Sequence, residues 1–154
     1  MKRIFLTLLV LVMWATSAFG AGSCVFTSKQ AFMGETGKVE KVIVRLTCTG
    51  DGSITAYSFD SKTFDVLGFY LYSVTTDPGT SAPTASYDIT LVVSSEDVAG
   101  GLLADRSASA TETKIICPTT QGYHIMDNND MAITFANNSA NPSTIVMDLE
   151  FVKN

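Results

Sequence analysis

The chain has 154 residues, of which 46% are apolar and 16% charged, and its formal net charge is −5. This length suits one domain with one hydrophobic core. An acidic surface repels phosphate backbones and anionic lipid, which argues against nucleic-acid and membrane-surface partners. The single histidine argues against enzyme classes whose sites need several. Composition therefore predicts an acidic globular domain without naming its function.

Residues 1–20 have the three parts of a secretory signal peptide: the basic pair Lys2-Arg3, an apolar block over 4–14, and the small-x-small site Ala18-Phe19-Gly20. The apolar block is shorter than the ~20 residues that a membrane-spanning helix needs. We expect cleavage before Ala21, which makes the charge two units more negative and leaves no membrane contact. The alternative is an uncleaved N-terminal anchor.

The next segment, residues 21–37, has few apolar residues and no clear period, which predicts an extended N-terminal arm before a domain of residues 38–154. Residues 42–48 then alternate between an apolar and a more polar face, as a half-buried strand does. The turn Gly50-Asp51-Gly52 ends this strand. Ile54–Phe59 is predicted to return beside it, so that the two form a hairpin.

Further strand patterns follow along the chain. Val66–Thr76 is rich in aromatic and β-branched residues and stops at the turn Asp77-Pro78-Gly79. Residues 100–106 are typical of a connecting loop. The other predicted strands are Tyr87–Val93, Thr113–Cys117, Tyr123–Met126, Met131–Phe135 and Thr144–Val152. About eight short strands without a long helix predict a single all-β domain, an antiparallel β-sandwich or jelly roll.

The three cysteines, Cys24, Cys48 and Cys117, allow one intramolecular disulfide at most. Export places them where disulfides persist, and we predict a Cys48–Cys117 bridge because both lie in strand-like segments. Cys24 is then a free thiol, a lipid site or half of an intermolecular bridge. The alternative for all three is a buried, reduced thiol that packs as a small apolar side chain.

Catalytic signals are weak. His124 lies in a predicted strand, and the chain has no nucleophile elbow to accompany it. Nothing in the sequence pairs any two carboxylates into a glycosidase site; the acids considered are Asp60, Asp65, Glu96 and Asp97. We therefore predict no catalytic residue and no enzyme activity.

Two groups of side chains are candidates for binding. Asp127, Asn129 and Asp130 concentrate oxygen ligands that suit calcium, although the favoured interpretation is an Asx-rich turn, and no other cofactor is predicted. Tyr70 and Tyr72, in an aromatic group with Phe64 and Phe69, are candidate glycan contacts if they are exposed together. The competing interpretation places one alternate set of these rings in the core.

From Gly68 to Glu112 the chain carries an ordered set of motifs: Asp77-Pro78-Gly79-Thr80, Ala82-Pro83-Thr84, Tyr87-Asp88-Ile89-Thr90-Leu91, Asp97-Val98, Gly100-Gly101, Ala104-Asp105-Arg106 and Thr111-Glu112. Together with Gly50-Asp51-Gly52 and Asn137-Asn138-Ser139, this set resembles a pattern that recurs in small uncharacterised proteins of tailed bacteriophages. The resemblance covers most of the chain after residue 37. It implies a virion-associated β-sandwich, a head or tail accessory subunit that works through protein contacts.

The predicted function is a non-enzymatic structural or interaction subunit of a virion or of an exported surface assembly. A thin sandwich with an extended arm offers strand edges for β-augmentation, so we expect protein partners, including further copies of this chain. Neither nucleic acid nor membrane is an expected partner. The alternative is a secreted carbohydrate-binding or adhesion module, and the expected location is extracytoplasmic or in a virion.

Overall fold

Within the described residues, nine strands form two antiparallel sheets. The structure is a computed structural model that describes residues 22–50, 57–116, 126 and 130–153. The strands are β1 (Ser23–Met33), β2 (Val39–Gly50), β3 (Tyr57–Phe59), β4 (Tyr70–Pro78), β5 (Asp88–Val93), β6 (Glu96–Asp97), β7 (Glu112–Ile115), β8 (Met131–Ala136) and β9 (Ser143–Val152).

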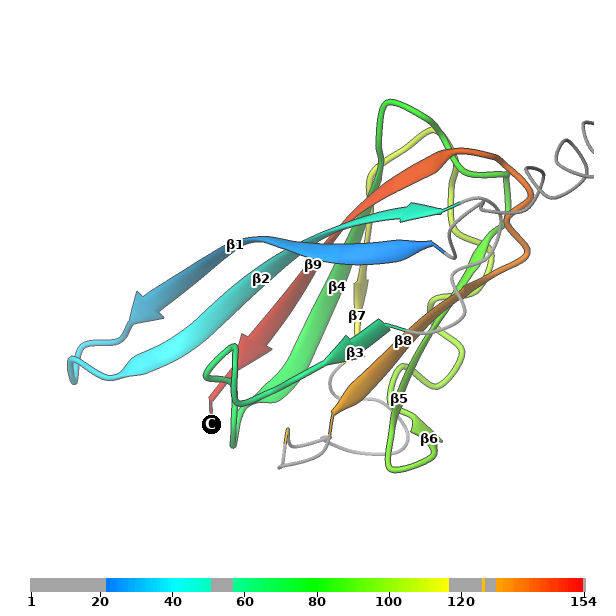
Figure 1. The fold of residues 1–154 in the computed structure, drawn as a ribbon. Helices are drawn as coiled ribbons and strands as arrows, with labels where there is room; N and C mark the ends of the chain where they lie inside the picture. Colours follow the sequence, from blue (N-terminus) through cyan, green and yellow to red (C-terminus); the bar gives the residue numbers. More distant parts are fainter. Residues whose placement is uncertain (1–21, 51–56, 117–125, 127–129, 154) are drawn as a thin grey trace, which may run out of the picture.

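The sheets have the strand orders β1-β2-β9-β4-β7 and β3-β8-β5-β6 (Figure 1). The predicted all-β sandwich is confirmed. The described residues include no helix, so none of them forms an apolar helix long enough to cross a membrane. The predicted leader, the predicted strand Tyr123–Met126 apart from its last residue, and His124 lie outside the described residues.

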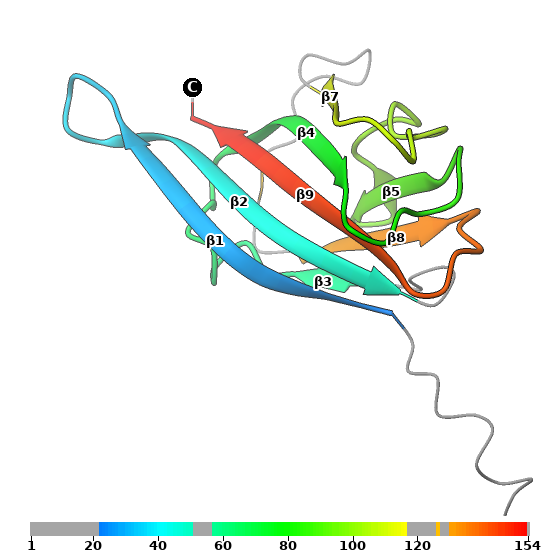
Figure 2. The ribbon, with the colours of Figure 1, turned by 90° about the horizontal axis from the view of Figure 1, so that it is seen from above.

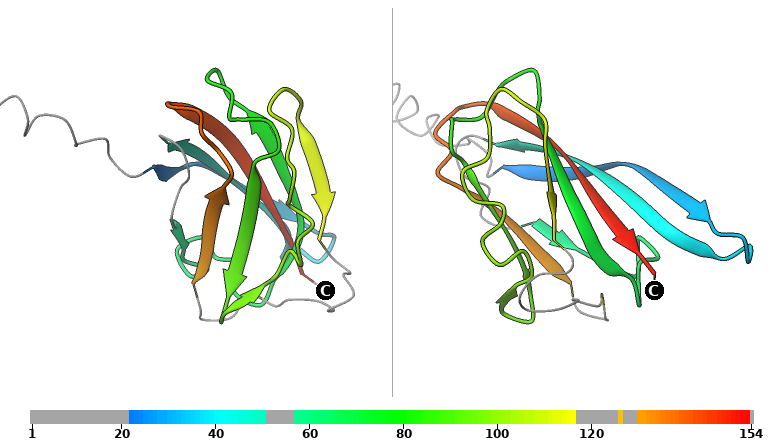
Figure 3. Two further views of the ribbon diagram at one scale, coloured as in Figure 1. Left: turned by 90° about the vertical axis from the view of Figure 1, so that its right-hand side faces the viewer. Right: turned by 180° about the vertical axis from the view of Figure 1, so that it is seen from behind.

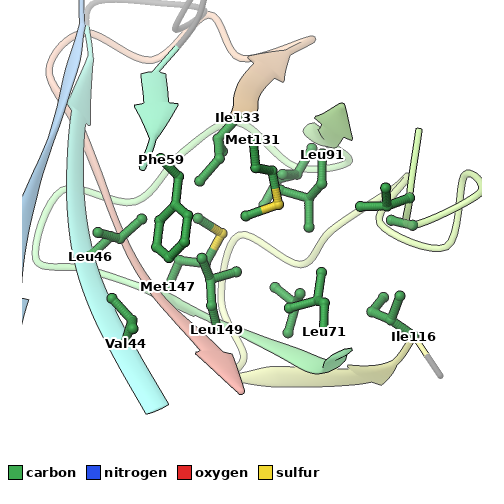
Figure 4. Packing of buried hydrophobic residues seen from close by; sticks show 14 of the residues in the cluster. Val44, Leu46, Phe59, Leu71, Leu91, Ile116, Met131, Ile133, Met147 and Leu149 are labelled. Carbon is green, nitrogen blue, oxygen red and sulfur yellow. The ribbon is translucent and has the colours of Figure 1, made fainter. Parts of the chain in front are cut away.

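Strand β9 shows why these residues form a sandwich. Its even-numbered side chains are half-buried, and its odd-numbered side chains point inward and are fully buried. The apolar side chains among the odd-numbered ones are Ile145, Met147, Leu149 and Phe151. This period of two is the geometry of a strand with one face on the core. Facing residues of β8 and β5 meet them from the other sheet, as the cluster in Figure 4 shows. Full burial of each such side chain contributes about 1.5–3 kcal/mol.

Aromatic rings join the two sheets at β3. The Phe59 ring stacks on Phe151 of β9 with a centroid separation of 5.5 Å, and on Phe64 at 4.4 Å. Phe59 is fully buried as a result. Burial of this ring holds β3 in the four-stranded sheet, where it pairs with β8.

The predicted hairpin of residues 42–48 and 54–59 is therefore wrong. Strand β2 pairs with β9 from Lys41 opposite Val152 to Gly50 opposite Ser143, and its other neighbour is β1. Strand β9 offers β2 a long, matching apolar alternation, whereas β3 has three residues. The long pairing buries more apolar surface than the local hairpin would, which explains why the chain changes sheets after β2.

The segment expected to be an N-terminal arm contains a strand. Residues 23–33 form β1, which pairs with β2 from Ser23 opposite Thr49 to Met33 opposite Val39. Irregularities in the register occur at 26–28 and 32–33. The far end of the β1–β2 hairpin extends beyond the four-stranded sheet (Figures 2 and 3).

The disulfide also differs from the predicted one. Cys48 is bonded to Cys24, not to Cys117, across the β1–β2 pair. Cys24 and Cys48 are directly opposite in the register and both point into the core, so pairing of the strands brings the two sulfur atoms together. The prediction failed because it treated the segment that carries Cys24 as lying outside the sheet.

One strand boundary and one short strand also differ from expectation. The strand predicted over 66–76 begins at Tyr70, because residues 60–69 form tight turns in which Asp65 has a φ of 52° and Gly68 a φ of 77°. The short strand β6, which follows a turn with positive φ at Ser94 and Ser95, was not expected.

Candidate protein-interaction surface

Strand β1 forms a long free edge. Within the described part of the chain its one strand neighbour is β2, so the backbone groups on its other side point away from the sheet. It has 11 residues, whereas the other edge strands, β7, β3 and β6, have 4, 3 and 2. A long open edge is a template for pairing with another chain, and short edges are the common protection against it.

The same strand exposes large apolar side chains. Half of the exposed large hydrophobic residues in the described ranges lie on β1: Val25, Phe26, Phe32 and Met33, with exposed fractions of 60%, 49%, 42% and 74%. Scattered exposed hydrophobics are ordinary, but a group on one edge strand marks an interaction surface. We call this group, with the β1 backbone, the β1 edge.

The β1 edge presents apolar groups on both faces. Val25 and Phe32 are opposite Thr47 and Lys41 on the outer face, and the Lys41 ammonium lies 4.9 Å from the Phe32 ring centroid. Phe26 is opposite the buried Leu46 on the inner face. Its ring lies 5.2 Å from that of Phe64. A partner strand that pairs with β1 would therefore find apolar contacts above and below its backbone.

The middle of the outer face, by contrast, is polar and internally paired. Arg45 on β2 donates two hydrogen bonds of 2.7 Å to the Asp148 carboxylate on β9, and these bonds with their charge attraction raise the pKa of Arg45. Glu150, two residues along β9, contacts Lys41 at 3.1 Å and accepts a 2.9 Å hydrogen bond from the Ser73 hydroxyl. These cross-strand pairs fix the register of the sheet and leave little apolar surface there for a partner.

A groove lies next to the inner face of the β1–β2 hairpin. It has a volume of about 320 Å³ and is lined by Lys29, Ala31, Lys38, Val39, Val42, Asp65, Phe69 and Lys153. The Lys29 ammonium contacts the Asp65 carboxylate at 2.7 Å, and the Lys153 ammonium lies 5.4 Å from the Phe69 ring centroid. We call this site the lysine groove, because three lysines line it, and we call its apolar lining residues, Ala31, Val39, Val42 and Phe69, the apolar floor.

The predicted calcium ligands are partly described. Asp130 accepts a 2.9 Å hydrogen bond from the Ser58 hydroxyl, while Asp127 and Asn129 lie outside the described residues. The ranges that the structure describes hold no group of three or more His, Cys, Asp or Glu side chains placed to bind a metal ion. Calcium binding stays a prediction.

The aromatic group divides between core and surface. Phe64 and Phe69 are buried, whereas Tyr70 is half-buried and Tyr72 is 36% exposed. Tyr72 lies at the irregularity between Leu71 and Ser73, and its carbonyl accepts a hydrogen bond from the Ile116 backbone. Neither tyrosine lines the lysine groove. A glycan contact by Tyr70 or Tyr72 stays a prediction.

Three of the four carboxylates weighed as catalytic acids are held by structural contacts. Asp60 accepts hydrogen bonds from the Thr63 hydroxyl and the Lys62 amide, and these bonds lower its pKa. Asp97 accepts from the amides of Ala99 and Gly101, and Asp65 pairs with Lys29. Asp60 and Asp97 thus stabilise turns, and the fourth acid, Glu96, is exposed on β6.

Sequence reasoning missed both surface features, although signals for each were present. Val25, Phe26, Phe32 and Met33 stand in a segment that was set aside for its lack of a period, yet an edge strand exposed on both faces has none. The groove lysines are separated by up to 124 positions, from Lys29 to Lys153, so no local motif reports them.

Comparison with known proteins gives no family. No protein-family model and no curated protein matches the sequence. A solved structure of the cyanophage Pam1 capsid asymmetric unit holds a similar chain, with 15% identity, coverage of 90% of this chain and 99% of that one, and a TM-score of 0.44. The C-terminal family 22 carbohydrate-binding module of Clostridium thermocellum Xyn10B matches with 16% identity, coverage of 88% and 87%, and a TM-score of 0.27. Both TM-scores are low, so we argue function from the surface of this chain alone.

Proposed function

We propose that the protein is a non-enzymatic structural subunit that assembles through protein contacts, either as a head or tail accessory component of a virion or in an exported surface assembly. The observation that carries the proposal is the β1 edge: an 11-residue edge strand with four exposed large apolar side chains. A surface of this kind is unfavourable in an isolated monomer and favourable once another strand covers it.

The simplest assembly pairs β1 of one copy with β1 of a second, antiparallel, about a two-fold axis. Such an interface uses the same surface on both copies and closes on itself, as most homodimers do. The pairing joins the two five-stranded sheets into one continuous sheet and satisfies the outward backbone groups of β1. Burial of the exposed parts of Val25 and Phe32 at the joint, 60% and 42% of the two residues, adds on the order of 1 kcal/mol for each side chain.

Introducing a charge on the β1 edge tests this proposal. We expect light scattering after size-exclusion chromatography to show that the wild type is oligomeric. We expect Phe32→Lys to raise the dissociation constant of this oligomer at least tenfold. Ile115→Lys is the matched control, because Ile115 is similarly exposed, at 52%, on the opposite edge strand β7. A wild type that stays monomeric at high concentration, or equal effects of both variants, would overturn the proposal.

The position of the N-terminus of the native protein distinguishes a virion subunit from an exported one. Intact mass on protein from its native source locates the N-terminus, and a start at Ala21 supports export. A start at Met1 in a purified particle fraction supports the virion interpretation, since virions assemble in the cytoplasm.

A carbohydrate-binding module is the second candidate, supported by the exposure of Tyr72 beside the half-buried Tyr70 on β4. Stacking of a sugar on an exposed ring would predict saturable glycan retention that Tyr72→Ala abolishes and Tyr72→Phe keeps. Retention unaffected by Tyr72→Ala, or none on a glycan panel, removes this candidate.

A further inference from the structure

The lysine groove is a basic site on an acidic protein. Lys29, Lys38 and Lys153 line it with a single carboxylate, Asp65, in a chain whose net charge is −5. Asp65 is engaged by Lys29, whereas no carboxylate of the described residues pairs with Lys38 or Lys153. The groove thus presents two lysines that form no ion pair within the described residues, Lys38 and Lys153, beside its apolar floor.

An occupant that complements this groove needs an apolar side chain with a carboxylate nearby. The floor consists of Ala31, Val39, Val42 and Phe69, and water covers it when the groove is empty. A volume of about 320 Å³ is large enough for one or two side chains but not for a folded element. A loop that projects one apolar side chain with a carboxylate beside it has this size and this chemistry.

This chain carries such a loop on its other side. Residues 98–105 follow β6, and in this loop Leu102 is 42% exposed and Asp105 is exposed. The next residue, Arg106, has a fully buried side chain, so its charge is not exposed beside Asp105. We call residues 98–105 the Leu102 loop.

Hydrogen bonds hold the start of the Leu102 loop, which reduces the entropy lost on binding. The Asp97 carboxylate accepts hydrogen bonds from the amides of Ala99 and Gly101. Gly100 and Gly101 have φ values of 57° and 77°, a region that glycine adopts at little cost, and they complete the tight turn that presents Leu102.

We propose that the lysine groove of one copy binds the Leu102 loop of a second copy. Leu102 covers the apolar floor, and the Asp105 carboxylate pairs with Lys38 or Lys153. The β1–β2 hairpin and the segment after β6 lie on opposite sides of the molecule (Figures 1 and 2), so a copy cannot fill its own groove. The contact joins two different surfaces and repeats from copy to copy as a ring or a filament.

This inference rests on the proposed function, assembly of the subunit, and names a second contact in it. The β1 edge gives a contact that closes about a two-fold axis, whereas the groove gives a contact that propagates. The two use different residues and are separable by mutation.

A charge-swap experiment tests the groove. Lys38→Glu and Asp105→Lys, each alone, place like charges at the contact, and we expect each to weaken association at least tenfold. An equimolar mixture of the two variants, and the double variant, restore complementary charges and association. Because Asp105 has a φ of 53°, Asp105→Asn, which tolerates that region, is measured beside Asp105→Lys to separate loss of charge from strain.

Apolar and charged controls lie elsewhere on the surface. Leu102→Ser is expected to weaken association, and Leu67→Ser, at 40% exposure, to leave it unchanged. Lys114→Glu, on the exposed face of β7, is the charge control. Circular dichroism and an intact disulfide verify that each variant is folded.

The readout is the dissociation constant from sedimentation at low and high salt, in the wild type and in Phe32→Lys. If Lys38→Glu weakens association and the mixture of variants restores it, the groove contact is supported. This holds even if Phe32→Lys has no effect and the β1 contact fails. If Phe32→Lys weakens association and Lys38→Glu does not, the groove contact is overturned and the proposed function stands. A monomeric wild type overturns both.

Discussion

At the scale of single residues, one arginine holds a long loop against the sandwich. The Arg106 side chain is fully buried, and its guanidinium donates to the Thr76 hydroxyl at 2.7 and 3.1 Å and to the Glu112 carbonyl at 2.7 Å. Its backbone bridges to Tyr87. One nitrogen, Nη1, makes no hydrogen bond within the described residues. A buried charge with such partners is costly to remove, because the partners lose their hydrogen bonds.

We therefore predict that Arg106→Met lowers the free energy of unfolding by about 3 kcal/mol, measured by urea denaturation. Lys114→Met, which removes an exposed cation, is expected to change it by no more than about 0.5 kcal/mol. Equal stability of Arg106→Met and the wild type would show that the hydrogen bonds to Thr76 and Glu112 contribute nothing net.

Tyr87 makes stability depend on alkaline pH. Burial raises the pKa of its hydroxyl above the usual 10.0, an effect that Thr76 and Arg106 partly offset. The unfolded chain therefore loses this proton at a lower pH than the folded chain. The contribution to stability is complete below pH 10 and is lost as the pH rises beyond it.

Replacing Tyr87 with Phe should flatten the fall in stability above pH 10, measured by urea denaturation across a pH series. Burial raises the pKa of Tyr57 too, so part of the decline remains. Tyr72→Phe, at an exposed ring, is the control for loss of a tyrosine hydroxyl and should change the free energy of unfolding at neutral pH by no more than about 0.5 kcal/mol. An unchanged profile in Tyr87→Phe would mean that this hydroxyl ionises equally in both states.

At the scale of elements, the disulfide attaches the edge strand to the core. Cys24 and Cys48 close a loop that spans the β1–β2 hairpin, with a sequence separation of 24. We predict that reduction destabilises the protein by about 3 kcal/mol in the chain-entropy model. Amides of β1 should then exchange faster, while those of the central strand β9 stay protected.

Hydrogen exchange with mass spectrometry, before and after reduction, measures this difference. Cys117→Ser is the matched control: it should keep the oxidised bridge and the wild-type protection of β1, since Cys48 pairs with Cys24. Loss of the bridge in Cys117→Ser, or a Cys48–Cys117 peptide in the digest, would contradict the pairing.

Strand alternation explains which elements were predictable. Strands β2, β5 and β9 bury every second residue and were recognisable from sequence, because a face on the core imposes a period of two. Which strands pair with one another could not be recognised from the sequence. The turn at 50–52 favoured a local hairpin, and only the three-dimensional core shows that β9 fits β2 better than β3 does.

The interaction surface was less predictable for a related physical reason. Residues on an edge strand meet solvent on both faces, so β1 has no burial period to detect. The lysine groove joins β1, the residues before β4 and the residue after β9, positions that only the folded chain brings together. The glycan candidates Tyr70 and Tyr72, which stay a prediction, could be proposed from sequence because they lie two positions apart, a short-range pattern that needs no knowledge of the fold.

At the scale of the whole molecule, the two proposed contacts lie at different places and obey different symmetry. The β1 edge pairs with itself and closes a dimer, whereas the lysine groove and the Leu102 loop join unlike surfaces. A subunit with both contacts forms chains of dimers or a closed shell-like array, whereas the β1 contact alone stops at a dimer and the groove contact alone gives a ring or a single chain. This combination suits a structural subunit better than a soluble binding module.

The assemblies formed after each contact is removed should therefore differ in kind. Lys38→Glu removes the unlike contact and should leave dimers, whereas Phe32→Lys removes the two-fold contact and should leave rings or single chains whose mass rises with concentration. Both changes together should leave monomers. Light scattering and electron microscopy on the same samples distinguish these states. Because the groove contact depends on exposed charges, only the assemblies of Phe32→Lys should dissociate as salt is raised, whereas the Lys38→Glu dimers, held by backbone pairing and apolar contact, should persist.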